Sequence, residues 1–305
     1  MSHRVFPILF LLFSAAFLLL CAGCGREEGK AGSMAAPSSS RTIFVSIAPQ
    51  REAVERIAGG HGWKVEVLVP SGASPESYSP DGRSLEALSH ARMLFTIGVP
   101  MEEALLPKVR ALSPGLKILD ATVGMEKEAF DGDAGEGADP HVWLSIPNME
   151  RFAAQVSGEL ARLEPEHADD YCAACLRYTD ELKALDKALA SQLAPLEGRP
   201  LLAYHPAFGY FIRRYGMTQL SIEREGKEPT GGYLNQVLSA AKAAGVPAIF
   251  VQPQFNPKPA QALAAELGCR LAVLNPLPED YLKDMAEMGA TVARAYGAQP
   301  AKEGI

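Results

Sequence analysis

The stretch HADDYCAACLRYTDELKALDKALASQL, residues 167–193, decides how the rest of the chain is organised. Its apolar side chains recur at steps of four and three, which predicts one continuous helix with a single buried stripe. The stripe consists of Tyr171, Cys175, Tyr178, Leu182, Leu185, Leu189 and Leu193. At 1.5 Å per residue this helix is roughly 40 Å long, enough to span two lobes. We therefore expect a rigid connector.

Short β-rich runs alternate with helix-length segments on both sides of the connector. The first set is TIFVSIA, WKVEVLV, MLFTIG and KILDAT, and the second is LLAYH, TQLSIE, AIFVQP and RLAVLNP. This alternation predicts βαβ units with parallel sheets. The predicted fold class is α/β, with two Rossmann-like lobes joined by a long rigid backbone helix and a ligand in the cleft between them. The lobes are expected over 42–146 and 198–305, with the connecting helices over 147–197.

The first 41 residues are expected to lie outside this fold. Arg4 precedes an uncharged run over residues 5–23, and the small pair Ala22-Gly23 stands directly before Cys24. A positive start, an apolar centre and small residues before a break predict a signal peptide over 1–23. The alternative is an uncleaved anchor helix, because the run is long enough to cross a bilayer. Residues 24–41, rich in Gly, Ser and Ala, predict a flexible tether.

Charge and cysteine content exclude some classes of protein. The formal net charge is −7, which argues against nucleic-acid binding, where clustered Lys and Arg would be expected. Beyond Cys24 only three cysteines remain, so no disulfide framework is implied. Cys172 and Cys175 form a CxxC pair, but Cys175 lies on the buried stripe, which favours packing over redox chemistry.

Four polar residues follow predicted strands or, in one case, an acidic loop, and they are the candidates for a binding site. Open α/β sheets bind ligands at the carboxyl ends of their strands, and two candidates come from each half. They are Glu76, His141, His205 and Asn275. Two imidazoles and a carboxylate suit Zn²⁺, and also Fe²⁺ or Mn²⁺. Taken singly, each residue also has an ordinary structural explanation, as a hydrogen-bonded histidine, a solvated turn or a residue before proline.

Two other functions fit the same residues. A metal-dependent hydrolase or oxygenase also uses two histidines and one carboxylate with an open position. The chain contains no HExxH and no GxSxG, and we find no convincing triad. The other alternative is a binding protein for a non-metal solute, or an adhesin.

Five segments together resemble one known family. PSGASPESYSP, DPHVWL, YHPAFGYFIRRYG, VQPQFNPKPAQALAAELG and LAVLNPLPEDYL occur in the order found in the cluster A-I solute-binding lipoproteins of zinc and manganese ABC importers, the group that includes the zinc-uptake receptors. The resemblance covers Ile43 to Ala295. It implies a monomeric, extracytoplasmic lipoprotein, in the periplasm or at the cell surface, anchored through lipid on Cys24. Such a protein captures zinc, or alternatively manganese or iron, for a permease in the cytoplasmic membrane and catalyses no reaction.

The resemblance extends to single positions, with departures. His141 and His205 match two family ligands, and histidine at 205 resembles the zinc branch. Glu76 stands where the family usually has His, Asn275 where it usually has Asp, and Gln252 where it often has Glu. The formal charge of the four residues with a dication remains +1, because one carboxylate is gained and another lost.

The sequence offers several candidates for the fourth metal ligand. Asn275, Glu279, Asp280 or water would complete the metal shell. The loop 123–139 is short and acidic and contains no histidine, which favours a solvated lid over a weak cation trap. The other histidines beyond the signal peptide, His61, His90 and His167, are assigned to the surface.

Overall fold

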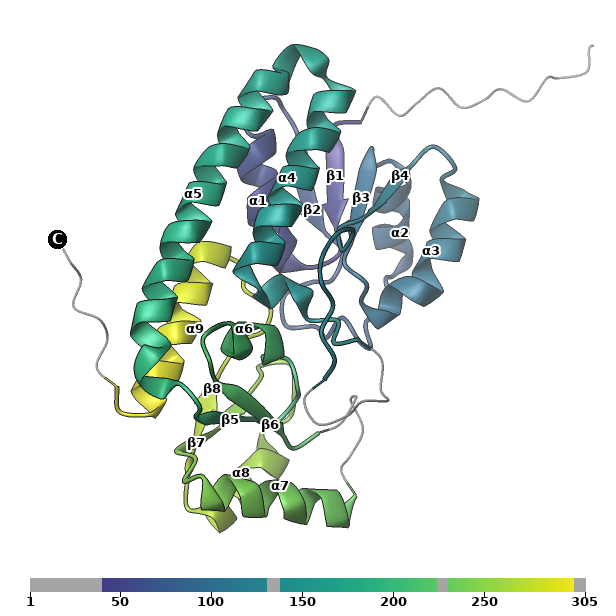
Figure 1. The fold of residues 1–305 in the computed structure, drawn as a ribbon. Helices are drawn as coiled ribbons and strands as arrows, with labels where there is room; N and C mark the ends of the chain where they lie inside the picture. The colour runs from purple at the N-terminus through teal and green to yellow at the C-terminus, as the bar shows by residue number, and fades with distance from the viewer. Residues whose placement is uncertain (1–39, 131–137, 224–229, 299–305) are drawn as a thin grey trace, which may run out of the picture. The chain divides into compact units, whose positions relative to one another are not determined.

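The computed structural model describes residues 40–130, 138–223 and 230–298. The predicted signal peptide, Cys24 and part of the acidic loop lie outside these ranges. The described residues belong to one compact unit that begins at Pro37. It contains two parallel sheets, which are separated in the chain by a pair of helices (Figure 1).

The first sheet is built from the N-terminal half of the chain. Its strands, in spatial order, are β2 (Lys64–Val67), β1 (Thr42–Val45), β3 (Met93–Thr96) and β4 (Lys117–Asp120). The helices between them are α1 (Arg51–Ala58), α2 (Gly82–Ser89) and α3 (Pro100–Leu112). Asp81 begins α2 as its N-cap, because its side chain accepts a hydrogen bond from Ser84 N at 2.8 Å.

The second sheet repeats the same arrangement. Its strands, in spatial order, are β6 (Thr218–Ser221), β5 (Pro200–Ala203), β7 (Ala248–Val251) and β8 (Arg270–Val273). Its helices are α6 (Gly209–Arg214), α7 (Gly231–Ala243), α8 (Lys258–Leu267) and α9 (Tyr281–Ala295). All described strand pairs are parallel, so the prediction of an α/β fold with two Rossmann-like sheets is confirmed.

The predicted connector is present as α5 (Ala168–Leu193), a helix of 26 residues that follows α4 (Ile146–Leu163). Six of the seven residues on the predicted stripe are buried, and Leu185 is partly buried. The helix contacts α1 from the first half, its neighbour α4 and α9 from the second half (Figure 1). One long helix therefore serves as a common wall for both halves.

A shared core also joins the halves directly. Trp143 is 2% exposed, and its indole Nε1 donates to the carbonyl of Pro276 at 2.6 Å. The fully buried Tyr281 donates from its hydroxyl to the carbonyl of Trp143 at 2.7 Å. Because Trp143 precedes the connector and the other two residues follow β8, these bonds join the end of the first half to the end of the second.

The cysteine predictions agree with the structure where it can be checked. Cys172 is exposed, Cys175 is buried on the stripe, and both are free, as is Cys269. Within the ranges that the structure describes, no helix combines the length and the apolar character needed to span a bilayer.

Close packing of α9 on α5 gives a stability prediction. A Cβ added at Gly289 would lie 2.2 Å from Leu189 Cδ2, so Gly289→Ala is expected to lower the free energy of unfolding by about 1–3 kcal/mol. Gly158→Ala is the matched control, because that glycine is also helical and a Cβ there meets nothing within 4 Å. The control should raise stability by up to about 1 kcal/mol. Urea unfolding measures both, and equal effects would contradict the packing argument.

Candidate metal centre

Glu76 is presented by a turn that follows β2. Ser74 organises the turn: its Oγ accepts from Glu76 N at 3.3 Å, and its carbonyl accepts from Tyr78 N at 3.0 Å. Pro75, which is buried, fixes the backbone directly before Glu76. The Glu76 side chain is 30% exposed, so this turn holds the carboxylate in a partly buried position.

His141 is held by its own local turn. Asp139 Oδ1 accepts from His141 N at 2.9 Å and lies 2.7 Å from its ring Nδ1. An aspartate that binds the backbone two residues on is a common turn former, and here the same oxygen also orients the ring. The Asp139 side chain is fully buried, and Arg213 Nη2 lies 3.8 Å from its other oxygen. The Nε2 atom of His141 is left to face the site.

His205 follows β5, and both its backbone N–H and its backbone carbonyl are hydrogen-bonded to one side chain. Gln252, at the end of β7, donates to the His205 carbonyl at 2.9 Å and accepts from its N–H at 3.3 Å. The ring stacks on Phe255 with centroids 5.0 Å apart. Its Nδ1 lies 2.9 Å from Glu223 Oε2, and its Nε2 lies 3.0 Å from Glu76 Oε1. The imidazole therefore stands between two carboxylates, one from each half of the chain.

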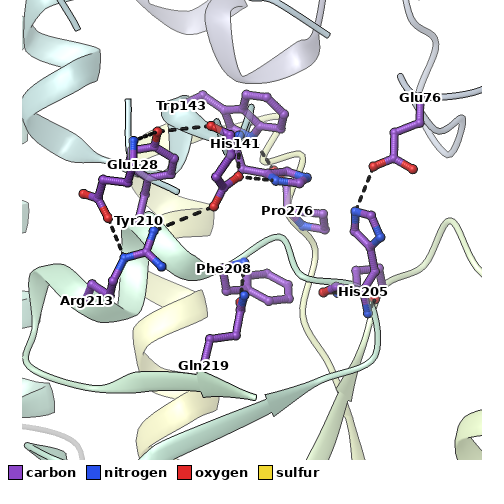
Figure 2. Close-up of polar contacts among 12 residues, drawn as sticks. Glu76, Glu128, His141, Trp143, His205, Phe208, Tyr210, Arg213, Gln219 and Pro276 are labelled. Atoms are coloured by element: carbon purple, nitrogen blue, oxygen red, sulfur yellow. Dashed lines mark hydrogen bonds and ion pairs between the residues drawn. The ribbon is translucent and has the colours of Figure 1, made fainter. Parts of the chain in front are cut away.

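The three predicted donors converge. One ligand atom from each of Glu76, His141 and His205 lies within 4.8 Å of the others, and the two imidazole centroids are 5.4 Å apart. Figure 2 shows the Glu76 carboxylate directed at the His205 ring, with His141 beside Trp143. The cavity that they line offers about 20 Å³ to the centre of a water-sized sphere. That is room for an ion or a single water, and not for an organic solute.

The pKa values of His205 and Glu76 are shifted in the directions that this geometry implies. Burial works against the charged form of His205, but its hydrogen bonds with Glu223 and Glu76, and their negative charges, prevail and raise its pKa to about 9. Burial also works against ionisation of Glu76, yet the hydrogen bond and charge of His205, with a contribution from His141, lower the pKa of Glu76. At neutral pH the metal-free site thus holds an imidazolium on His205 against the carboxylate of Glu76.

The fourth candidate, Asn275, lies next to this cavity with its carboxamide already engaged. Its Oδ1 accepts from Gln254 Nε2 at 2.9 Å and from Leu277 N at 3.1 Å, and its Nδ2 donates to Leu277 O at 3.1 Å. Asn275 lines a neighbouring hollow together with Glu279. The Glu279 carboxylate lies 4.0 Å from Arg51 Nη2, and Asp280 is exposed.

Two residues of the site were not among the candidates from sequence, Asp139 and Glu223. Each of these two residues has a signal in the sequence. Asp139 stands two residues before His141, the spacing of an aspartate turn. Glu223 follows β6 as His205 follows β5, and the parallel register that pairs Ala203 with Ser221 brings these two side chains side by side.

These features define a class of protein. Two α/β halves share a connecting helix, and an ion-sized cavity between them is lined by two imidazoles and a carboxylate. This is the architecture of a solute-binding protein whose solute is a metal ion.

Comparisons with known proteins agree. The family model for zinc-uptake complex component A, periplasmic, matches residues 43–295. The high-affinity zinc uptake system protein ZnuA of Brucella abortus (strain 2308) is 28% identical over 287 residues, covering 79% of this chain and 85% of the relative. The manganese-binding lipoprotein MntA of Halalkalibacterium halodurans is 26% identical, covering 78% of each chain. A crystal structure of a 138–173 ZnuA deletion mutant with zinc bound aligns with a TM-score of 0.79 at 36% identity, covering 85% of this chain and 99% of that chain.

The chain therefore belongs to the family of periplasmic zinc-uptake component A proteins. It is an extracytoplasmic substrate-binding protein for uptake of a divalent metal, zinc or manganese, by an ABC importer, and it is not an enzyme. The resemblance found in the sequence is confirmed at the level of the family.

The carboxylate pair around His205 gives a pH prediction. In the metal-free protein this ring should titrate near pH 9, above its ordinary value of about 6.5. A pKa raised by folding stabilises the protein fully below about pH 6.5, and this stabilisation is lost as the pH rises through 9. Ring-proton NMR gives the pKa of His205, and urea unfolding across pH 6–10 gives the stability. Glu223→Gln should lower that pKa and flatten the profile, whereas titration of His205 at or below pH 6.5 in the parent protein would contradict the arrangement.

Proposed function

We propose that Glu76, His141 and His205 bind one divalent transition metal as the transported cargo, with zinc preferred. The observation that carries this proposal is the convergence of the three donors, from loops far apart in the chain, on a cavity of about 20 Å³. An ion fits that volume once it has shed most of its water.

Capture then proceeds by exchange of a proton for the metal. In the metal-free site a proton on His205 Nε2 faces Glu76 at 3.0 Å. The incoming dication takes its place, while Nδ1 of each histidine keeps its proton and donates it in a hydrogen bond to Asp139 or Glu223. Carboxylates in that position fix the ring orientation and increase the basicity of the ligating nitrogen. Binding should release about one proton, so affinity should fall about tenfold for each pH unit below 9.

The donor set favours zinc over the alternatives. Two imidazole nitrogens and one carboxylate suit a borderline dication, whereas Mn²⁺ prefers more oxygen donors. Iron(II) accepts the same set and remains an alternative cargo. The preference is a difference of affinities, which direct competition between Zn²⁺ and Mn²⁺ measures.

Water is proposed as the fourth ligand. For Asn275 to take that role, its Oδ1 would have to give up hydrogen bonds to Gln254 and Leu277. Glu279 would have to leave Arg51. Asp280 is exposed and does not line the cavity. A water molecule needs no such rearrangement and leaves a position through which the ion can enter.

The organisation around the site is proposed from sequence and family together. Residues 1–23 are a lipoprotein signal peptide, Cys24 carries the lipid, and 24–41 tether the folded part. The N-terminal lobe is 42–146, the connecting helices are 147–197, and the C-terminal lobe is 198–305. The monomeric receptor hands its ion to a permease in the cytoplasmic membrane. That the relative MntA is itself named a lipoprotein supports the anchor.

Removal of a donor tests the cargo site. Glu76→Gln keeps the size of the side chain but removes its charge, and we expect the Kd for zinc to rise at least about 100-fold, equivalent to about 2.7 kcal/mol. His141→Ala should have an effect at least as large. Competition with a chromophoric chelator at pH 7.5 measures both.

Asn275→Ala is the matched control, because it removes a donor that borders the cavity without entering the proposed shell. Its Kd should stay within about threefold of the parent value. If Glu76→Gln binds zinc as the parent does, the proposed ligand set is wrong. If the parent holds no metal at micromolar Zn²⁺ or Mn²⁺, the receptor carries a different solute.

The anchor has its own test. Cys24→Ser removes the thiol that lipid would modify, and the protein should move from the membrane fraction to the soluble extracytoplasmic fraction. Fractionation with immunoblotting detects the shift. Retention of the variant in membranes would instead support an uncleaved N-terminal helix.

A further inference from the structure

A second group of metal-binding side chains lies outside the cleft. His61, His167 and Asp170 each offer one ligand atom within 4.8 Å of the others. His61 Nε2 lies 3.5 Å from Asp170 Oδ2, and the two imidazole centroids are 4.1 Å apart. The sequence assigned both histidines to the surface; in the structure both are partly exposed, while His90 is exposed.

The three residues come from two separate segments of the chain. His61 lies in the turn after α1, between Gly60 and Gly62, whose φ angles of 84° and 73° give the turn its shape. His167 ends the short helix Pro165–His167 and directly precedes α5, and Asp170 lies in the first turn of α5. This group therefore connects a loop of the N-terminal half to the start of the connector.

The His61 ring is held in place. Its side chain is 15% exposed, and the ring of Tyr171 meets it edge-on with centroids 4.9 Å apart. Tyr171 is itself anchored, because its hydroxyl donates to Glu164 and accepts from Trp63 Nε1 at 3.3 Å. Because the His61 ring is already held in place, less conformational entropy is lost when it binds a ligand.

We propose that His61, His167 and Asp170 form a second site for a divalent transition metal, with water completing the shell. Donors around tetrahedral zinc stand roughly 3.3 Å apart, given bonds of about 2.0–2.1 Å. Asp170 is 68% exposed and free to rotate toward the rings. A plain ion pair explains the approach of His61 to Asp170, but it does not explain why a second imidazole lies against the first.

The surrounding charges permit a cation there. Arg41 donates to the His61 carbonyl at 2.5 Å, and its charge is paired with Glu164 at 2.6 Å. The positive N-terminal end of α5 opposes a cation. The exposed carboxylates of Glu166 and Asp169 stand beside the site and offset that end. The greater exposure of this site predicts weaker binding than in the cleft.

Counting bound zinc tests the second site. The full chain is dialysed against excess Zn²⁺ alone and analysed for metal per chain. The parent should bind two ions, His167→Gln one, and the double variant His141→Ala with His205→Ala one. In that double variant, further addition of His167→Gln should reduce binding below one-tenth of an equivalent. Loss of the cleft site alone would therefore leave the second site measurable, so the two proposals fail separately.

Two control variants define the ligands. His90→Gln removes an exposed histidine elsewhere, and Cys172→Ser removes the exposed thiol two residues after Asp170; both should keep two ions. If His167→Gln is poorly folded, NMR of the histidine rings in the parent protein replaces it. The ring nitrogens of His61 and His167 should shift with the second equivalent of zinc. Equal zinc content in the parent and in His167→Gln, loss of the second ion in Cys172→Ser, or unmoved ring signals would overturn the proposal.

Discussion

The site depends on one imidazole, His205, that stands between a carboxylate from each half of the chain. Two carboxylates directed into a largely buried cavity repel one another unless a positive charge lies between them. A proton on His205 supplies that charge in the metal-free protein, and a metal ion supplies it in the proposed complex. Proton and metal thus compete for one place, and either of them holds Glu76 against the opposite half.

The scaffold joins the two halves of the chain around this site. The connector α5 contacts helices from both halves, and buried hydrogen bonds link Trp143 with Pro276 and Tyr281. A cavity of about 20 Å³ has room for an ion stripped of most of its water and not for a larger solute.

The departures from the family pattern have a consistent electrostatic meaning. Placing a carboxylate at position 76 moves negative charge into the N-terminal half, where it faces His205 directly. With Asn275 in place of the usual aspartate, the opposite loop keeps its turn through neutral hydrogen bonds. Gln252, where the family often has Glu, binds the His205 backbone with both amide atoms and adds no charge. For the four candidate ligands, which do not include Gln252, the formal charge that the resemblance implies is preserved while its position changes.

The sequence by itself determined the repeating α/β pattern, the connector with its buried stripe, and the candidate donors Glu76, His141 and His205, because periodicity and the residues that follow strands and loops are local properties. Only the tertiary structure decided that these donors converge and which residues are their partners. Glu223 meets His205 because β6 lies beside β5 in a fixed register, and His61 meets His167 because the turn after α1 packs on the start of α5. Such contacts join segments far apart in the chain, and no local pattern specifies which strand or helix will be the neighbour.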